Sequence, residues 1–144
     1  MEPRDILNYV VNQPEVLRNV APGFDSVDIS AFLEKPRNVM LGDEHGVLIF
    51  GYIGEDVYEM HYLFTSAVRG RDALHFTRAA LKYMFTCASA IAIVGQTPRD
   101  NRAARVMNRA LGARPIGESV DTSGRPCINY MLERKTWAVS SAES

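Results

Sequence analysis

The chain has 144 residues, of which 47% are hydrophobic and 23% are charged, and its formal net charge at pH 7 is -1. This length and composition are typical of one soluble globular domain that is large enough to bury a core. A net charge so close to zero argues against a general nucleic-acid or acidic-membrane coat, although a local basic patch is still compatible with it.

The cysteines and the first residues bear on the compartment. Cys87 and Cys127 have no nearby Cys or His companion, which excludes a disulfide scaffold or a zinc module as the organising device. The start, MEPRDIL, has acidic residues where a signal peptide needs basic and then apolar ones. No apolar run approaches the roughly 18 residues of a membrane span. We therefore expect a cytoplasmic protein with no membrane partner and no bound metal.

The first third of the chain predicts two helices. The spacing of apolar residues in PRDILNYVVN is that of an amphipathic helix. The chain restarts at Pro14, and DSVDISAFLE predicts a short second helix that ends at Pro36. We expect its N-cap to be one of three side chains: Asp25, Ser26 or Asp28.

From residue 38 the hydrophobic period changes to two. NVMLG and GVLIFGYIG predict two strands joined by a hairpin turn at DEHG. The third strand, VYEMHYLF at residues 57–64, is the most informative one. Its alternation divides its residues between two faces: Tyr58, Met60, Tyr62 and Phe64 on one, and Val57, Glu59, His61 and Leu63 on the other. We expect this strand to be central and covered on both faces.

The second half of the chain alternates helices and strands. A helix over residues 72–86, whose N-cap is Asp72 if the turn before it is purely structural, is apolar around enough of its circumference to pack onto a sheet. AIAIVG, residues 90–95, predicts a buried parallel strand. The next segment, TPRDNRAARVMNRALG, predicts a helix capped by Thr97 and closed by Gly112. PIGESV and CINYML predict a closing hairpin, and residues 138–144 a disordered tail.

This order of elements predicts an α/β (α+β) fold in one domain, residues 1–137. We expect a mixed, mostly antiparallel sheet with a right-handed β-α-β crossover between residues 57–64 and 90–95. Helices should cover both faces of this sheet.

The stretch SAVRGRDAL lies where a strand is followed by the start of a helix. Free backbone N–H groups at such a point attract anions, and Gly70 lets the backbone approach a ligand closely. Arg69 and Arg71 add positive charge. Two interpretations stay open on these residues alone: a phosphate site, or a structural turn with solvated arginines.

The chain resembles the GNAT N-acetyltransferase superfamily over about residues 38–133. The resemblance lies in the order of the elements and in two stretches, LFTSAVRGRDAL and TPRDNRAARVMNRALGARPIG. That family has an R/Q-x-x-G-x-G/A loop, which binds the pyrophosphate of acetyl-CoA, and a later N-x-x-A-x-x-x-Y-x-x-x-G-F helix. Gly70 matches the first glycine of the loop, and Asn101, Ala104 and Gly112 match the helix motif. The sequence VYEMHYLF…RGR in particular is similar to that of small family members encoded by bacteriophages and prophages.

The resemblance implies a GNAT-like fold and an acetyl-CoA-dependent enzyme that moves the acetyl group directly from the thioester to an amine. The acceptor would be an amine of a small molecule or a protein, which the sequence does not identify, and a homodimer is compatible with it. The residues that would bind the cosubstrate acetyl-CoA are Phe64, Val68, Arg69, Gly70, Arg71 and Asn101.

Amine acetylation needs a base that takes a proton from the ammonium group. Glu59 and His61 share one face of a strand that we expect to be covered, where they are costly unless paired or functional. Family members often place a glutamate base on this strand. Glu59 would therefore be the base, directly or through water and His61; the alternative is an internal hydrogen-bonded pair without a catalytic role.

Two departures from the family pattern favour a different function. Asp72 stands where the loop usually has Gly or Ala, and Asn108 stands where the family often has the tyrosine that protonates the departing thiolate. Tyr62 and Tyr130 are the candidates to replace that tyrosine. The alternative function is a catalytically degenerate GNAT-fold binding or assembly protein, derived from a phage.

Overall fold

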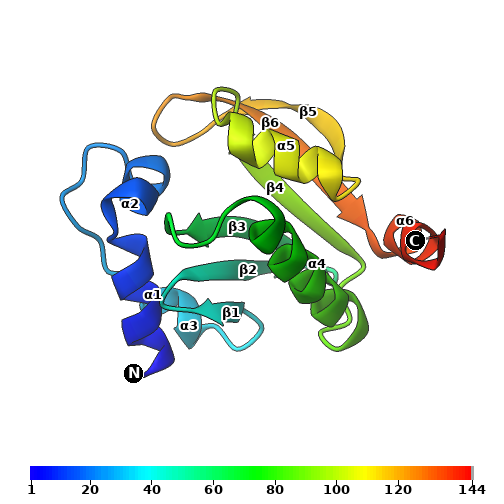
Figure 1. The fold of residues 1–144 in the computed structure, drawn as a ribbon, viewed down its shortest axis with the longest axis horizontal. Helices are drawn as coiled ribbons and strands as arrows, with labels where there is room; N and C mark the ends of the chain where they lie inside the picture. Colours follow the sequence, from blue (N-terminus) through cyan, green and yellow to red (C-terminus); the bar gives the residue numbers. More distant parts are fainter. Residues whose placement is uncertain (144) are drawn as a thin grey trace.

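The computed structural model describes residues 1–143, which form six strands and six helices (Figure 1). The strands are β1 (Val39–Asp43), β2 (Gly46–Gly54), β3 (Val57–Phe64), β4 (Ala92–Pro98), β5 (Arg114–Val120) and β6 (Pro126–Glu133). The helices are α1 (Pro3–Val11), α2 (Pro14–Val20), α3 (Ala31–Glu34), α4 (Gly70–Thr86), α5 (Arg102–Ala110) and α6 (Arg134–Glu143).

The six strands of residues 1–143 form one sheet in the order β1-β2-β3-β4-β6-β5. Neighbouring strands are antiparallel except β3 and β4, which are parallel and are joined through α4. The predicted mixed, mostly antiparallel sheet with one β-α-β crossover is therefore confirmed.

Helices cover both faces of the sheet, as predicted, and they enclose two apolar clusters. The larger cluster lies under α4 and α5, which pack on the same face (Figure 1), and its buried members from the sheet are Leu48, Phe50, Tyr58, Ile93 and Leu132. The smaller cluster joins α1 and α2 to the opposite face through Leu7, Val10, Val16, Val47, Ile49 and Leu63. Successive residues of a strand point to opposite faces, so β2 contributes Val47 and Ile49 to one cluster and Leu48 and Phe50 to the other.

Two asparagines, one in α1 and one at its C-cap, hold the segment that follows α2. The Asn12 side-chain oxygen accepts from the Val27 N–H at 2.8 Å, and the Asn8 side-chain oxygen accepts from the Ile29 N–H at 2.9 Å. Because the two asparagines lie one turn apart, they act on the same side of the helix. This fixes the segment against the sheet and so positions Phe32.

The amino-terminal helices differ from the prediction in two ways. Pro14 is the first residue of a further helix, α2, which the sequence analysis did not predict. At this position the N–H that proline lacks would have no partner within the helix. The next helix, α3, has Ser30 at its N-cap position, so the three predicted caps are wrong. The Asp28 carboxylate instead accepts from the Ser30 N–H and hydroxyl, which makes a local turn before the helix.

The two later helices also begin at other residues than predicted. Arg69 is the N-cap residue of α4, and Asp72 lies in its first turn, not at the cap. The N-cap of α5 is Asn101, whose side chain accepts from the Ala104 N–H at 3.2 Å. Thr97, the predicted cap, belongs to β4, because that strand stays paired with β6 to its end and the ladder overrides the local capping pattern.

The end of the chain is helical where the sequence predicted a disordered tail from residue 138. Helix α6 continues through Glu143, and its Trp137 ring packs on Phe85 of α4 at 5.8 Å between centroids, which gives the helix an apolar anchor. Residue 144 of that predicted tail lies outside the described residues. Among the helices of residues 1–143, none is both long and apolar enough to cross a membrane.

Burial varies along β2, and this predicts a large difference between two substitutions on that strand. Leu48 is fully buried and Ile53 is 58% exposed. Leu48→Ala should lower the free energy of unfolding by about 2–5 kcal/mol, because it leaves a cavity between sheet and helices. Ile53→Ala should lower it by about 1 kcal/mol or less. Urea denaturation of both variants measures this, and equal losses would contradict the position assigned to β2.

Candidate functional site

The parallel strands β3 and β4 are paired only at their beginnings. Their register runs from Val57↔Ala92 to Glu59↔Val94 and stops there. Beyond this point β3 remains paired with β2, and β4 with β6, to their last residues. Each of the two strands therefore has one edge whose backbone groups have no strand partner.

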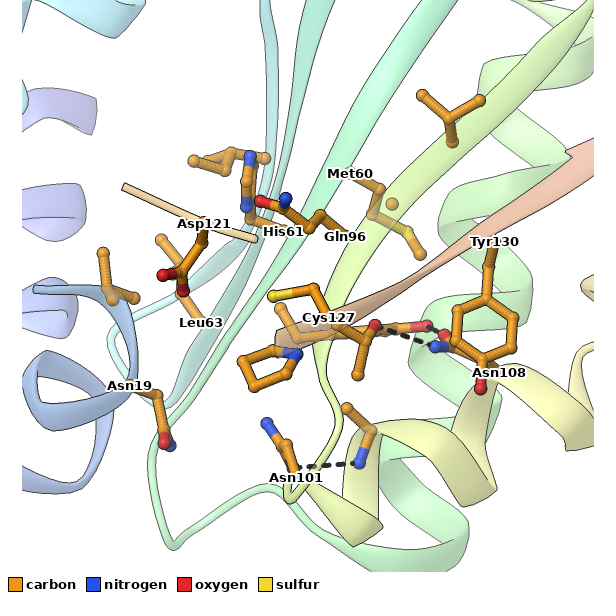
Figure 2. Close-up of a pocket in the computed structure, with 18 of the residues that line it drawn as sticks. Asn19, Met60, His61, Leu63, Gln96, Asn101, Asn108, Asp121, Cys127 and Tyr130 are labelled. Atoms are coloured by element: carbon orange, nitrogen blue, oxygen red, sulfur yellow. Dashed lines mark hydrogen bonds between the residues drawn. The ribbon is translucent and has the colours of Figure 1, made fainter. Parts of the chain in front are cut away.

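A cleft of about 620 Å³ opens between the separated strands (Figure 2). Its walls are residues 60–63 of β3, residues 93–98 of the β4 region and the inner side of α5. The segment around Asp28, the β5–β6 turn at residues 121–125 and residues of β6, among them Cys127 and Tyr130, also line it. The cleft thus has one side toward α4 and α5 and the other toward α2 and the turn.

The predicted catalytic pair, Glu59 and His61, lies at this cleft. The His61 Nε2 and Glu59 Oε1 atoms are 2.8 Å apart, and His61 lines the cleft whereas Glu59 does not. The hydrogen bond from His61 lowers the pKa of Glu59 below its ordinary value, against a smaller opposing effect of burial. The carboxylate is therefore ionised at neutral pH and can orient the imidazole.

The expectation that both faces of β3 are covered is wrong at this pair. The side chains of His61 and Glu59 are 45% and 44% exposed. The reason is that α1 and α2 pack over β2 and β3 at Val47, Ile49 and Leu63, and leave the face beside β4 open. The pair therefore needs no buried-charge compensation, and solvent or a substrate can reach it.

A second polar group on the cleft wall consists of Tyr62, Asn108 and Thr97, here called the hydroxyl–amide trio. The Tyr62 hydroxyl donates to Asn108 Oδ1 at 2.7 Å, and Asn108 Nδ2 donates to Thr97 Oγ1 at 3.0 Å. Dashed lines at Asn108 in Figure 2 mark hydrogen bonds of this residue. Burial raises the pKa of Tyr62, so the hydroxyl is protonated at neutral pH. Because Asn108 belongs to α5, its two hydrogen bonds link β3 and β4 through this helix, at the level where the two strands are no longer paired with each other.

Sequence reasoning missed Thr97 as a cleft residue, because the pattern TPRD resembles a helix start. The signal that was available is its position two residues after the β-branched strand AIAIVG. Asn108 was noticed only as a departure from the family motif, and Tyr62 only as a candidate replacement for the missing tyrosine. The structure brings the three side chains into one hydrogen-bonded group.

The β5–β6 turn is attached to α2 and closes one side of the cleft. The Arg125 Nε donates to the Asp121 carboxylate at 2.8 Å, and its guanidinium also donates to the Asn19 carbonyl at 2.7 Å. Hydrogen bonds from the Arg125 backbone, more than from its side chain, lower the pKa of Asp121. Beside them, burial raises the pKa of the Cys127 thiol and keeps it protonated.

The predicted phosphate loop lies at the start of α4. Gly70 is the first helical residue and has φ +61°, a conformation that favours glycine. The N–H groups of this first turn have no acceptor within the helix, so they can bind an anion. The loop before it is fixed: Arg69 Nε donates to the Ser66 carbonyl at 2.9 Å, and the Ser66 N–H donates to the Glu15 carboxylate at 3.2 Å.

The structure separates the predicted cosubstrate residues into two groups. Asn101 lines the cleft, whereas Phe64, Val68, Arg69, Gly70 and Arg71 do not. Val68 and Asp72 line a smaller hollow of about 370 Å³ beside the β1–β2 turn, and Phe64 packs on the Tyr62 and Phe76 rings. Within residues 1–143, no three His, Cys, Asp or Glu side chains gather as a metal site.

A protein-family model described as "Protein of unknown function (DUF2824)" matches residues 8–137. The chain belongs to the DUF2824 family. A comparison with curated proteins gives no match for this DUF2824 protein.

Several solved structures share the fold of this DUF2824 protein. A single-residue variant of spermidine N-acetyltransferase SpeG from Vibrio cholerae matches with TM-score 0.74 and 16% identity, over 98% of this chain and 96% of that one. A putative acetyltransferase from T. thermophilus matches with TM-score 0.69 and 17% identity, over 99% and 88%.

A ribosomal-protein-S5-alanine acetyltransferase from Vibrio fischeri matches with TM-score 0.60 and 15% identity, over 69% of this chain and 62% of that one. The DUF2824 protein therefore spans less than two thirds of that relative. Together these matches confirm the predicted GNAT fold, and at such identities they establish the fold alone.

The Glu59–His61 bond predicts a measurable change in acidity. In His61→Phe the carboxylate loses its partner but keeps its partial burial, so the pKa of Glu59 should rise to its ordinary value of 4.5 or above. In the native protein this bond stabilises the fold above the unfolded pKa, and the contribution is lost as pH falls through the lowered native pKa. Carboxyl NMR titration measures the shift. An unchanged Glu59 pKa would mean that the bond does not persist in solution.

Proposed function

We propose that this DUF2824 protein is an acetyl-CoA-dependent N-acetyltransferase, which transfers the acetyl group directly to an amine of a small molecule or a protein. The observation that carries the proposal is the separation of β3 and β4. It provides a cleft with unpaired backbone edges whose wall carries the His61 imidazole, and α4 begins at Gly70, shortly after the end of β3.

The pantetheine arm of acetyl-CoA suits the unpaired strand edges. It is extended and carries two amide groups, and an extended amide chain can hydrogen-bond to a free strand edge as an added strand does. The edge beyond Glu59 on β3 is free in this way. Asn101 lies at the end of the cleft and would contact the arm.

The pyrophosphate would bind at the start of α4. Gly70 has no atom within 4 Å of where a Cβ would stand, so a phosphate can approach the backbone N–H groups there. Arg69 and Arg71 add charge to this position. Asp72 lies on the side of the helix that faces Asp43 and His45, in the hollow beside the β1–β2 turn.

The chemistry would begin at His61, which lines the cleft where Glu59 does not. The neutral imidazole takes a proton from the acceptor ammonium group, while the Glu59 carboxylate orients the ring and stabilises its charged form. The amine nitrogen then bonds to the thioester carbon, the C–S bond breaks, and the nitrogen gives up a second proton. Of the two protons that leave the nitrogen, one ends on the thiolate and the other is released to solvent. In this form of the proposal Glu59 is a positioning residue and His61 is the base.

A second function is a GNAT-fold binding or assembly protein of phage origin that has lost turnover. Asn108 favours it, because this residue replaces the family's tyrosine and both ends of its amide are occupied by Tyr62 and Thr97. The two functions differ in turnover, so the experiments below separate them.

Acetyl-CoA should raise the melting temperature. At a concentration 100 times its Kd, a ligand of the native state stabilises by about 2.7 kcal/mol. For a chain of this size the shift is roughly several degrees. Gly70→Glu should abolish it, because a carboxylate and its side chain would occupy the phosphate position. Gly70→Ala is the matched control, since it brings the same backbone strain without the charge and should keep part of the shift. A wild-type protein with no shift would contradict cosubstrate binding.

Turnover should distinguish the roles of His61 and Glu59. His61→Gln removes the base and should lower kcat by about 10²–10⁴-fold. Glu59→Gln only weakens the orientation of the ring and should cost less, and both variants should keep the affinity for acetyl-CoA. Thiol release with a panel of amines measures kcat. A greater loss in Glu59→Gln would make Glu59 the base, and a wild type that binds acetyl-CoA without acetylating any amine would favour the binding protein.

A further inference from the structure

The hydroxyl–amide trio has more hydrogen-bond donors than the protein uses. Tyr62 and Thr97 each carry one hydroxyl proton and the Asn108 amide carries two N–H groups, so the trio has four donors. Only two of them take part in the bonds that link the three side chains. With Tyr62 donating to Asn108 and Asn108 donating to Thr97, the Thr97 proton is left over. Among residues 1–143 the Thr97 hydroxyl donates to no protein acceptor.

The surplus does not depend on how the Asn108 amide is oriented. Rotating the amide by half a turn lets Thr97 donate to the oxygen and lets the nitrogen donate to Tyr62, so that the Tyr62 proton is left over instead. In both orientations one hydroxyl proton and one amide N–H have no acceptor in the protein. Thr97 and Asn108 are buried, at 5% and 4% exposed, and Tyr62 is partly buried. Buried donors without an acceptor are costly, and all three residues line the cleft, so an acceptor on a ligand would satisfy them.

The trio and His61 lie on opposite sides of the opening in the sheet. His61 and Tyr62 are consecutive residues of β3, so their side chains point to opposite faces. Thr97 and Asn108 are on the Tyr62 side, toward α5. A planar carbonyl group held in the gap between β3 and β4 would have the base on one side and the trio on the other. The amine can then approach from the His61 side while the oxygen contacts the trio.

We infer that the hydroxyl–amide trio is the hydrogen-bond donor site for the carbonyl oxygen of the acyl thioester. The inference rests on the proposed function, because the acyl group is supplied by acetyl-CoA. Neutral donors suit a carbonyl oxygen better than a phosphate or carboxylate, which proteins bind with cations. The Arg125 guanidinium, which also lines the cleft, is already bonded to Asp121 and to the Asn19 carbonyl.

The trio would act when negative charge develops on that oxygen. As the amine adds, the carbonyl becomes a tetrahedral oxyanion, and a hydrogen bond to it becomes stronger than the one to the thioester. The hydroxyl of Tyr62 or Thr97 donates the hydrogen bond to this oxygen, so the residue that does so is a catalytic residue. Asn108 is a positioning residue, since its amide sets which hydroxyl is free.

The decisive variant is Asn108→Asp, which changes almost no volume. A carboxylate accepts from both hydroxyls at once and has no N–H, so no donor is left for the ligand. We expect kcat/KM for acetyl-CoA to fall by about 10²–10³-fold, as on loss of an oxyanion donor. The affinity for CoA, which has no acyl carbonyl, should be unchanged, whereas the affinity for acetyl-CoA relative to CoA should fall by several-fold.

A second set of variants keeps Asn108 and tests the shared donor directly. Tyr62→Phe and Thr97→Val each leave one hydroxyl, which the amide can turn toward the ligand, so each should lose much less activity than Asn108→Asp. The double variant Tyr62→Phe/Thr97→Val has no hydroxyl and should lose more than the two single losses combined. Melting temperature and CoA titration of every variant show that the fold and the cosubstrate site persist.

Three outcomes would overturn the inference. If Asn108→Asp and the double variant turn over like wild type, the trio has no catalytic role although the acetyltransferase function stands. If each single variant is as impaired as the double variant, the two hydroxyls do not share one task. If the wild type binds CoA but neither discriminates acetyl-CoA nor turns it over, the proposed function and the inference both fall.

Discussion

The parallel ladder between β3 and β4 ends after Glu59 and Val94, and the rest of the candidate site depends on that interruption. A strand inside a sheet normally uses both edges, and unpaired backbone groups inside a protein are costly. Here each strand keeps its outer partner, so the sheet remains continuous while its centre opens. The interruption creates a passage from one face of the sheet to the other, which neither face could provide alone.

The two faces of this passage have different chemical character because a strand alternates its side chains. On one side, the Glu59–His61 pair is half exposed and holds a charge. On the other, the hydroxyl–amide trio is neutral, and two of its members, Thr97 and Asn108, are buried. A base that exchanges protons with solvent needs contact with water, whereas neutral hydrogen-bond donors bind a ligand better where water is excluded. A pocket on one face of the sheet would have to place both in the same environment. Because β3 places consecutive side chains on opposite faces, the two groups lie on opposite sides of its backbone.

Much of the fold follows from local sequence patterns. The period of two over residues 57–64 correctly assigned each residue of β3 to its face, and the apolar circumference of residues 72–86 predicted the helix that covers the sheet. The error at Thr97 has its cause in pairing between distant residues. Thr97 looks like a helix cap in its own segment, and only its pairing with Ile128 of β6 keeps it in a strand.

The candidate site was predictable to a different degree. The pair Glu59 and His61 was found because both residues lie on one face of one strand. Its exposure was not predictable, since that depends on where α1 and α2 stop on the sheet. The trio was also out of reach of sequence reasoning, because its members come from β3, β4 and α5, and only tertiary packing brings them together.

The bond from Arg125 to the Asn19 carbonyl joins two parts of the chain that are 106 positions apart. During synthesis α2 is complete long before the β5–β6 turn exists, so the side of the cleft near α2 stays open until the last hairpin forms. The same is true of β4, whose second edge has no partner before β6 is made. Contacts this far apart in sequence form late in folding. A growing chain therefore exposes the β4 edge on the ribosome, and only a chain with its final strand in place has a closed site.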